Sequence, residues 1–163
     1  MTRAVLVVVC ILFVLLLVAG MRWGWRNRMA RQSELQPLPV LPTGLSAPTL
    51  ESTGLYVGTT FSSSWQDRVV HGGLGDRADA IARLHEEGLE LDRQGTDALF
   101  VPASSWVEAR LAPGLAGKVV GAGGLLVVRW RLGDALLDTA FRADDKTTYP
   151  DWVNAINEKA VQA

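Results

Sequence analysis

One stretch of the sequence places glycines and acidic residues where a dinucleotide-binding site needs them. In "VVHGGLGDRADAIARLHEEGLELDRQG", Gly73, Gly75 and Ala78 fit the form G-x-G-x-x-A, and Asp92 follows Gly73 by 19 residues. In dinucleotide-binding folds such glycines let a phosphate approach the start of a helix, and the acid binds a ribose hydroxyl. This interpretation requires a strand, a turn and then a helix over "DRADAIARLHEEG", with Asp76 at its start.

The same stretch fits a second interpretation, in which it forms two antiparallel strands. The turn "HEEG" then joins the strands "ADAIARL" and "GLELDR", with Leu89 and Leu91 facing inward and Glu90 and Asp92 facing outward. The strand needed before the glycines is only the short "DRVV", and the later sequence indicates hairpins rather than the crossover units of a parallel sheet. The nucleotide site is therefore the minor alternative.

Other residues that could do chemistry form no convincing catalytic or metal-binding set. Ser64, Asp67 and His71 fall within eight positions of a polar segment, where such a combination is expected by chance. His71 and His85 have no cysteine near them, so they make a poor metal site, and we expect both to be solvated in loops. We predict no catalytic residue, no cofactor and no metal, and therefore no enzyme.

The N-terminal residues form the most distinctive segment of the chain. Residues 4–21 carry no charged side chain, and 13 of these 18 residues are Leu, Ile, Val or Phe. A helix of that length spans about 27 Å, close to the thickness of a bilayer core, and its insertion is strongly favoured. A cleaved signal peptide is disfavoured, because Val18-Ala19-Gly20 is a poor cleavage site. We predict a transmembrane anchor with a basic flank over residues 1–31, with Cys10 buried and inert.

The charges beside this segment predict its orientation. One arginine lies before it, whereas four arginines follow it and no acidic residue occurs before Glu34. Basic flanks stay in the cytoplasm, so residues 32–163 are predicted to lie at the cytoplasmic face of the cell (inner) membrane, held by a single pass. The predicted membrane-anchoring flank comprises Arg22, Trp23, Trp25, Arg26, Arg28 and Arg31.

The chain after residue 31 begins with a proline-rich segment and is acidic. Residues 32–51 hold four of the seven prolines of the chain, which favours an extended, semi-rigid linker. A proline-rich ligand for a partner is the alternative. Eleven basic and 17 acidic side chains follow residue 31, a net charge of −6. That acidity argues against nucleic-acid binding, which needs a basic face.

Residues 52–163 suffice for one compact domain, and their periodicity is mainly that of β-strands. Alternation in "LLVVRWRL" places Leu126, Val128 and Trp130 on one face, and the Gly-Asp turn that follows leads into "ALLDTAFRA". These two segments are predicted to form a hairpin.

Two further elements are predicted on either side of this hairpin. Upstream, alternation in "SWVEARLA" places Val107, Ala109 and Leu111 together on one face of a strand. Downstream, the sequence predicts a helix over "TTYPDWVNAINEKAVQ", capped by Thr148. The face of this helix predicted to be buried comprises Tyr149, Trp152, Val153, Ile156 and Ala160.

The order of these segments supports a resemblance to a known family. The runs "GLYVGTTFSSSWQDRVVHGGLGDRA", "LFVPASSWVEARLAPGLAGKVV" and "GGLLVVRWRLGDALLDTAFRADD", followed by a helix, resemble the PH-like domain of small actinobacterial membrane-anchored proteins. The resemblance implies a bent antiparallel β-barrel of about seven strands, closed by the C-terminal helix. Some members are labelled transporters or exported proteins, but one helix offers no translocation path. Lipid head-group binding is not carried over, because Arg68 and Arg77 are offset by Asp67 and Asp76.

Taken together, the sequence predicts a membrane-tethered, non-catalytic PH-like module that binds a protein partner or serves assembly at the cytoplasmic membrane face. The alternatives are a module that senses a lipid or ligand and, in third place, a nucleotide-binding enzyme that uses the "GLGDRA" turn. The predicted partner-binding residues are Leu115, Val119 and Val120, within "GLAGKVVGAGG". An open sheet edge that accepts an added strand is a further candidate surface.

Overall fold

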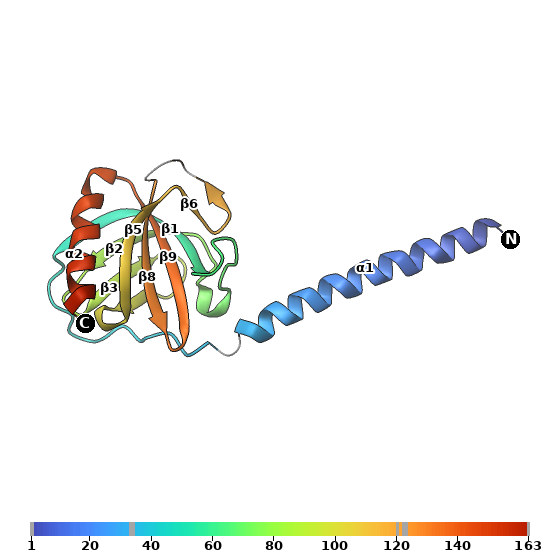
Figure 1. The fold of residues 1–163 in the computed structure, drawn as a ribbon, viewed down its shortest axis with the longest axis horizontal. Coiled ribbons are helices and arrows are strands. Elements are labelled where there is room, and N and C mark those ends of the chain that lie inside the picture. The colour runs from blue at the N-terminus through green and yellow to red at the C-terminus, as the bar shows by residue number, and fades with distance from the viewer. Residues whose placement is uncertain (1, 33–34, 120, 122–123, 163) are drawn as a thin grey trace. The chain divides into compact units, whose positions relative to one another are not determined.

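A computed structural model describes residues 2–32, 35–119, 121 and 124–162. The chain divides into two compact units, Met1–Glu34 and Leu35–Ala163. The first unit is the helix α1 (Thr2–Gln32), which continues beyond the uncharged segment through the basic flank (Figure 1). Its side chains from Val9 to Gly24 are exposed. Among the residues that the structure describes, no helix is both long and apolar enough to cross a membrane.

The second unit is built on one antiparallel sheet with the strand order β4-β3-β2-β1-β9-β8-β5 (Figure 1). Its strands are β1 (Leu50–Phe61), β2 (Ala78–Leu84), β3 (Gly88–Arg93), β4 (Leu99–Pro102), β5 (Trp106–Ala112), β8 (Leu125–Leu132) and β9 (Ala135–Ala143). A separate two-stranded hairpin consists of β6 (Gly114–Leu115) and β7 (Lys118–Val119). The predicted mainly β fold, with seven antiparallel strands and a C-terminal helix, is therefore confirmed.

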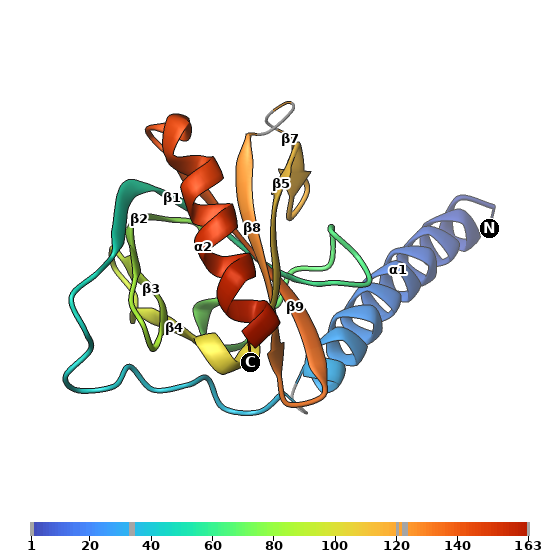
Figure 2. The same ribbon diagram turned by 60° about the vertical axis from the view of Figure 1, so that its left-hand side comes forward.

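The two edges of the sheet are consecutive in the chain and lie close together. Between β4 and β5 there is only the short helix η2 (Ala103–Ser105). The indole Nε1 of Trp106 donates to the backbone oxygen of Val101 at 3.1 Å, which joins the two edge strands. The C-terminal helix α2 (Tyr149–Gln162) lies across the curved sheet, between β1 to β4 on one side and β8 and β9 on the other (Figure 2).

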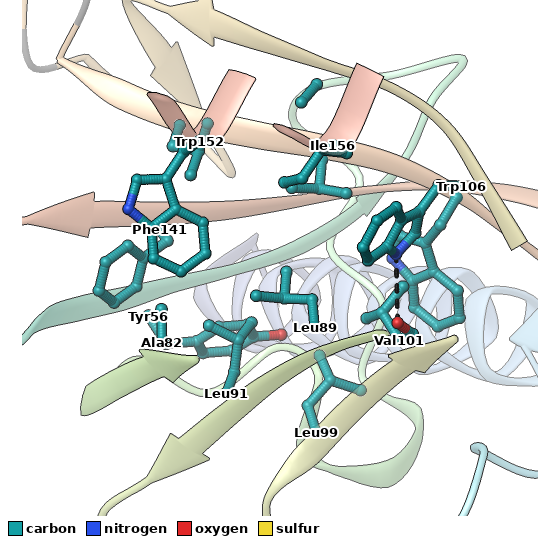
Figure 3. Packing of buried hydrophobic residues seen from close by; sticks show 14 of the residues in the cluster. Tyr56, Ala82, Leu89, Leu91, Leu99, Val101, Trp106, Phe141, Trp152 and Ile156 are labelled. Atoms are coloured by element: carbon teal, nitrogen blue, oxygen red, sulfur yellow. Dashed lines mark hydrogen bonds between the residues drawn. The ribbon is translucent and has the colours of Figure 1, made fainter. Parts of the chain in front are cut away.

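The main hydrophobic core fills the interior of this curved sheet. Figure 3 shows Leu89 and Leu91 of β3 and Trp106 of β5 directed toward Trp152 and Ile156 of α2. Trp152 and Ile156 are at most 1% exposed, which confirms the predicted inner face of the helix. An aromatic side chain of this size dominates the energetics of the core that it fills.

A second, smaller core lies on the outer face of the same sheet. It is formed by the side chains of Val57, Ala112, Leu115, Leu125, Val127 and Ala140. Leu115 comes from β6, so the β6–β7 hairpin covers part of the outer face. Because both faces of β8 are covered at this point, its first four residues are all buried instead of alternating.

Both predicted hairpins are present. The strands β8 and β9 pair with Val128 opposite Thr139, and Leu126, Val128 and Trp130 lie in the main core, as predicted. The strands β2 and β3 pair around "HEEG" with Leu84 opposite Leu89, which confirms the antiparallel interpretation of that stretch. No helix follows the glycines, because β2 begins at Ala78.

One prediction about strand faces is wrong. Val107 and Leu111 of β5 are 38% and 43% exposed, whereas Trp106 and Ala109 are buried. The pairing of β5 with β8 shifts register between Trp106 and Glu108. The bulge separates Val107 from the face of Ala109. Leu111 lies beyond the bulge opposite Leu126 and shares the face of Ala109, as predicted, but its side chain is exposed there.

The segment before β1 lies against the domain. We call residues 35–49 the strap. Leu35 and Leu38 pack against the main core, and Thr49 N–H donates to the Leu84 oxygen at 2.7 Å. The sequence predicts a linker over residues 32–51 and a domain from residue 52, whereas the compact unit already includes the strap. Proline directs this segment to an extended form, and its leucines supply the contacts.

Candidate functional site

The glycine-rich turn that resembles a phosphate-binding loop has the wrong polarity for that role. Its backbone carbonyls accept hydrogen bonds from side chains. Gly73 O accepts from Arg93 at 2.7 Å, Leu74 O accepts from the Tyr56 hydroxyl at 2.7 Å, and Gly75 O accepts from Arg68 at 2.7 Å. A phosphate-binding loop directs N–H groups at its ligand instead. The "GLGDRA" turn is therefore built to hold cationic and hydroxyl side chains.

The remaining candidates for catalysis are also placed by the structure. Asp92, the predicted ribose ligand, lies on β3 opposite Ile81 and pairs with Arg83 at 3.4 Å. Ser64 and Asp67 meet through their backbones, with Asp67 N–H donating to Ser64 O at 3.0 Å. Within the described part of the chain, no group of three or more His, Cys, Asp or Glu residues is arranged to hold a metal ion.

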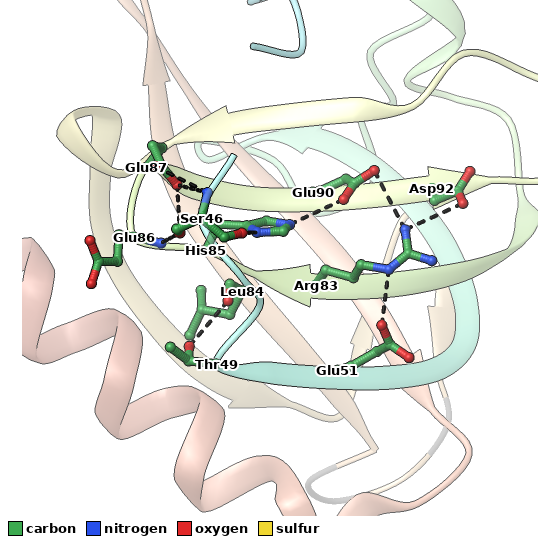
Figure 4. Close-up of polar contacts among 10 residues, drawn as sticks. All are labelled: Ser46, Thr49, Glu51, Arg83, Leu84, His85, Glu86, Glu87, Glu90 and Asp92. Atoms are coloured by element: carbon green, nitrogen blue, oxygen red, sulfur yellow. Dashed lines mark hydrogen bonds and ion pairs between the residues drawn. The ribbon is translucent and has the colours of Figure 1, made fainter. Parts of the chain in front are cut away.

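A polar cluster lies where the strap meets the turn between β2 and β3 (Figure 4). His85 in this turn is 4% exposed, so its predicted solvation is wrong. Its Nδ1 lies 2.7 Å from the backbone oxygen of Ser46, and its Nε2 lies 3.1 Å from Oε2 of Glu90. Burial of a polar ring requires such partners, and the strap supplies one of them.

Ser46 is the residue of the strap that makes most of these contacts. Its N–H lies 3.2 Å from each carboxylate oxygen of Glu87, and its hydroxyl donates to Oε2 of Glu87 at 2.8 Å. The Glu86 N–H in turn donates to the Ser46 hydroxyl at 2.9 Å. The hydrogen bonds from Ser46 hold the pKa of the exposed Glu87 carboxyl below its usual value.

A second set of charges extends from the same turn along the outer face of the strands. Arg83 of β2 lies 3.0 Å from Glu51, 3.5 Å from Glu90 and 3.4 Å from Asp92. Glu90 therefore contacts both Arg83 and His85, which joins the two sets. Figure 4 shows Arg83 directed away from the strap, between the carboxylates of β1 and β3.

Beside these charges a concavity of about 390 Å³ opens on β1, β2 and β3. Its lining includes the carboxylates of Asp79, Asp92 and Asp144, and Thr53 donates to Asp144 at 2.9 Å. An acidic lining of this kind repels phosphate groups. The concavity is therefore unsuited to anionic lipid head groups.

The predicted partner-binding residues have different environments. Leu115 is 1% exposed in the second core, which removes it from the predicted contact surface because its side chain packs against the sheet. Val119 is 73% exposed on β7, and Val120 lies outside the described residues. In the membrane-anchoring flank, Arg22 and Trp23 are exposed on α1. The side chains of Trp25, Arg26, Arg28 and Arg31 lie outside the described part of the structure.

An exposed tryptophan lies next to the same hairpin. Trp65, in the loop after β1, is 46% exposed, and its backbone oxygen accepts from Ala116 N–H at 2.7 Å. Arg68 donates through Nε and Nη2 to Ala116 O at 3.2 and 2.9 Å. These bonds fix the loop to the turn between β6 and β7. We call Trp65 and Val119 the exposed pair; the only signal of Trp65 in the sequence is one aromatic residue within a polar run.

The curved antiparallel sheet, its two meeting edges and the C-terminal helix across it define a PH-like domain. The model of the family described as Bacterial PH domain-like matches residues 35–157, and the chain belongs to this family. The match begins at the strap and ends within α2, so it includes every strand of the sheet. Comparison with the curated proteins finds no matching sequence.

Proposed function

We propose that this chain is a membrane-tethered, non-catalytic PH-like module that binds another protein at the cytoplasmic face of the cell membrane. The observation that carries the proposal is the exposed pair, Trp65 and Val119, on a loop and a hairpin fixed to each other by hydrogen bonds. Aromatic residues are enriched at protein interfaces, and a surface that is already rigid loses little entropy on binding.

The tether in this proposal is α1. Residues 4–21 carry no charge, and exposed apolar side chains occur at every position from Ile11 to Val18, on all sides of the helix. In water such a helix leaves apolar surface unburied all round, whereas hydrocarbon accommodates it. The four arginines after residue 21 support a cytoplasmic domain.

The topology is tested by fusing reporters after Ala163. We expect a fluorescent protein that folds in the cytoplasm to be active and alkaline phosphatase, which requires export, to be inactive. Extraction of the membrane fraction with alkaline carbonate tests the tether separately. Active alkaline phosphatase would reverse the proposed orientation, and release of the chain by carbonate would remove the anchor from the proposal.

The interaction is tested by purifying the tagged full-length chain in mild detergent. We expect a protein to co-purify in a stoichiometric amount, and the double variant Trp65→Ser, Val119→Ser to lose it. The matched control is Val161→Ser, because Val161 is 88% exposed on α2 and lies outside the exposed pair. A lipid or nucleotide that co-purifies in place of a protein would support the sensing or enzymatic alternative.

A further inference from the structure

The strap contacts three turns of the domain. Gln36 lies against Gly133 in the turn between β8 and β9, and Leu38 lies against Gly72 in the short helix η1 (His71–Gly73). Ser46 lies against the turn between β2 and β3. In Figure 2 this segment runs along one end of the domain before it enters β1. The contact at Ser46 is polar, and it depends on His85, a residue that can change its charge.

His85 faces a hydrogen-bond acceptor at each ring nitrogen. The Ser46 backbone oxygen at Nδ1 can only accept, and an ionised Glu90 at Nε2 can only accept. A neutral imidazole carries one N–H, so it satisfies one of these two partners and directs a lone pair at the other. Only the imidazolium donates to both. At 4% exposure, water cannot readily replace the lost bond.

We propose that His85 is a proton-operated latch for the strap: its imidazolium form bonds both Glu90 and Ser46, whereas its neutral form keeps its one N–H on the Glu90 carboxylate, the stronger acceptor, and releases Ser46. Histidine is the side chain whose charge ordinarily changes between pH 5 and 8. The latch therefore closes on acidification and opens as the pH rises. The inference concerns the strap and is independent of the identity of any partner.

Charged groups from β2, β3, α2 and the β2–β3 turn lie near this histidine. Glu90 of β3 and Glu87 of the turn favour the imidazolium, whereas Arg83 of β2 opposes it through its pairing with Glu90. From α2, the Lys159 ammonium donates to the His85 backbone oxygen at 3.2 Å and also opposes the charge. The carboxylate in direct contact, Glu90, lies nearest to the ring and favours the closed latch.

The contact at Ser46 should also weaken at acidic pH, when Glu87 becomes protonated. Glu87 holds the Ser46 N–H and hydroxyl only as a carboxylate, and these bonds lower the pKa of Glu87. A carboxyl whose pKa is lowered on folding stabilises the bound form above its ordinary pKa and loses that effect as the pH falls through the lowered value. The contact at Ser46 is therefore weakened both when Glu87 gains a proton and when His85 loses one.

Opening the latch changes the length of free chain before β1. The contacts of Gln36 and Leu38 do not involve His85, so the opened latch frees residues 39–47, which extend to about 28 Å in the form that proline favours. The distance over which the domain can search for a partner then depends on pH. The latch thereby supplies regulation that is built into the chain itself.

The experiment measures amide hydrogen exchange in the full-length chain in detergent between pH 5 and 8.5, as protection factors relative to intrinsic rates. The Ser46 amide reports directly on the latch, because it donates to Glu87. We expect its protection to fall about tenfold or more as the pH rises, the size expected for a lost hydrogen bond to a charged group. Amides of β8 should keep their protection over the same range.

Two variants and one control assign the effect. His85→Gln should remove the pH dependence at Ser46. Glu90→Gln should also flatten it, because a side-chain amide donates to the neutral ring. His71→Gln is the matched control, since His71 is the other histidine of the chain and should leave the pH dependence unchanged. Protection at Ser46 that is independent of pH in the wild-type chain, or that changes equally in His85→Gln, would overturn the latch. The wild-type result decides even where a variant fails to fold.

Discussion

The side-chain amide of Asn157 makes with Ala109 the two hydrogen bonds that a neighbouring strand would make. Ala109 N–H donates to Oδ1 of Asn157 at 2.7 Å, and Nδ2 of Asn157 donates to Ala109 O at 3.0 Å. Ala109 lies in β5, an edge strand of the sheet. Unpaired edge strands invite pairing with other chains, so α2 protects the centre of this edge with one residue.

Replacing Asn157 by Ala leaves both backbone groups of Ala109 without this partner. We expect the free energy of unfolding to fall by about 1 to 3 kcal/mol, the cost of unsatisfied polar groups. Urea denaturation of the full-length chain in detergent measures it, and size-exclusion chromatography shows whether the open edge causes association. Asn154→Ala is the matched control, because Asn154 is exposed on the same helix. Equal losses in the two variants would contradict this role of Asn157.

A chain of hydrogen bonds in the interior has a fixed direction. The Trp130 indole donates to the Thr139 hydroxyl at 2.9 Å, which lies 2.7 Å from the Thr59 hydroxyl. The Thr59 hydroxyl lies 2.8 Å from that of Tyr56, which donates to Leu74 O at 2.7 Å. Because an indole only donates and a carbonyl only accepts, each hydroxyl must donate toward Leu74.

Interrupting this chain at Thr139 should be costly. Thr139→Val removes the acceptor of the Trp130 indole while keeping the shape of the side chain. We expect the unfolding free energy to fall by about 1 to 3 kcal/mol. Thr139→Ser keeps the hydroxyl and should lose less, although it removes a methyl group. A valine variant as stable as the serine variant would show that the hydroxyl chain adds nothing to stability.

Trp152 is the largest side chain that α2 contributes to the main core. It is 1% exposed, and its indole donates to the Ser52 hydroxyl at 3.1 Å. We expect Trp152→Ala to lower the free energy of unfolding by about 3 to 5 kcal/mol, because the cavity cannot close fully. Val161→Ala, at a position that is 88% exposed, should change it by less than about 0.5 kcal/mol. A loss below about 1 kcal/mol for Trp152→Ala would mean that the helix does not close the core.

Both tyrosines of the chain should ionise at a higher pH than a tyrosine exposed to solvent. Burial raises the pKa of Tyr56 to about 12, and burial also raises the pKa of Tyr149. The phenols ionise nearer pH 10 once the chain is unfolded, so this contribution to stability is complete below about pH 10 and is lost as the pH rises toward 12. The absorbance of the phenolate band should rise only above about pH 10, the ordinary pKa of tyrosine. A rise near pH 10 without unfolding would contradict the burial of both phenols.

The sequence alone predicts the parts of the fold that depend on local alternation. The hairpin of β8 and β9 follows from the alternation of Leu126, Val128 and Trp130, whose side chains all face the main core. The inner face of α2 follows from helical spacing in the same way. The second interpretation of residues 78–93 is confirmed for a related reason, since Leu89 and Leu91 alternate with charged residues.

The features that the sequence does not predict depend on contacts between distant residues. His85 is buried because Ser46, 39 positions earlier, covers it. Leu115 is buried because the outer face of the sheet carries a second core, which no periodicity within "GLAGKVV" indicates. Thr148 does not cap α2 with its hydroxyl, which donates back to the oxygen of Asp145 at 3.1 Å in the short helix η3 (Lys146–Thr148) region. These contacts require the tertiary fold.

The inward carbonyls of the "GLGDRA" turn make the two ends of the domain respond differently to acid unfolding. At that turn, Arg93 is held by the oxygens of Gly73 and Asp97, and Arg68 by that of Gly75, none of which protonates at moderately low pH. At the Ser46 contact, by contrast, the strap depends on the Glu87 carboxylate, which does protonate. Acid should therefore loosen the contact at Ser46 before it loosens the glycine turn.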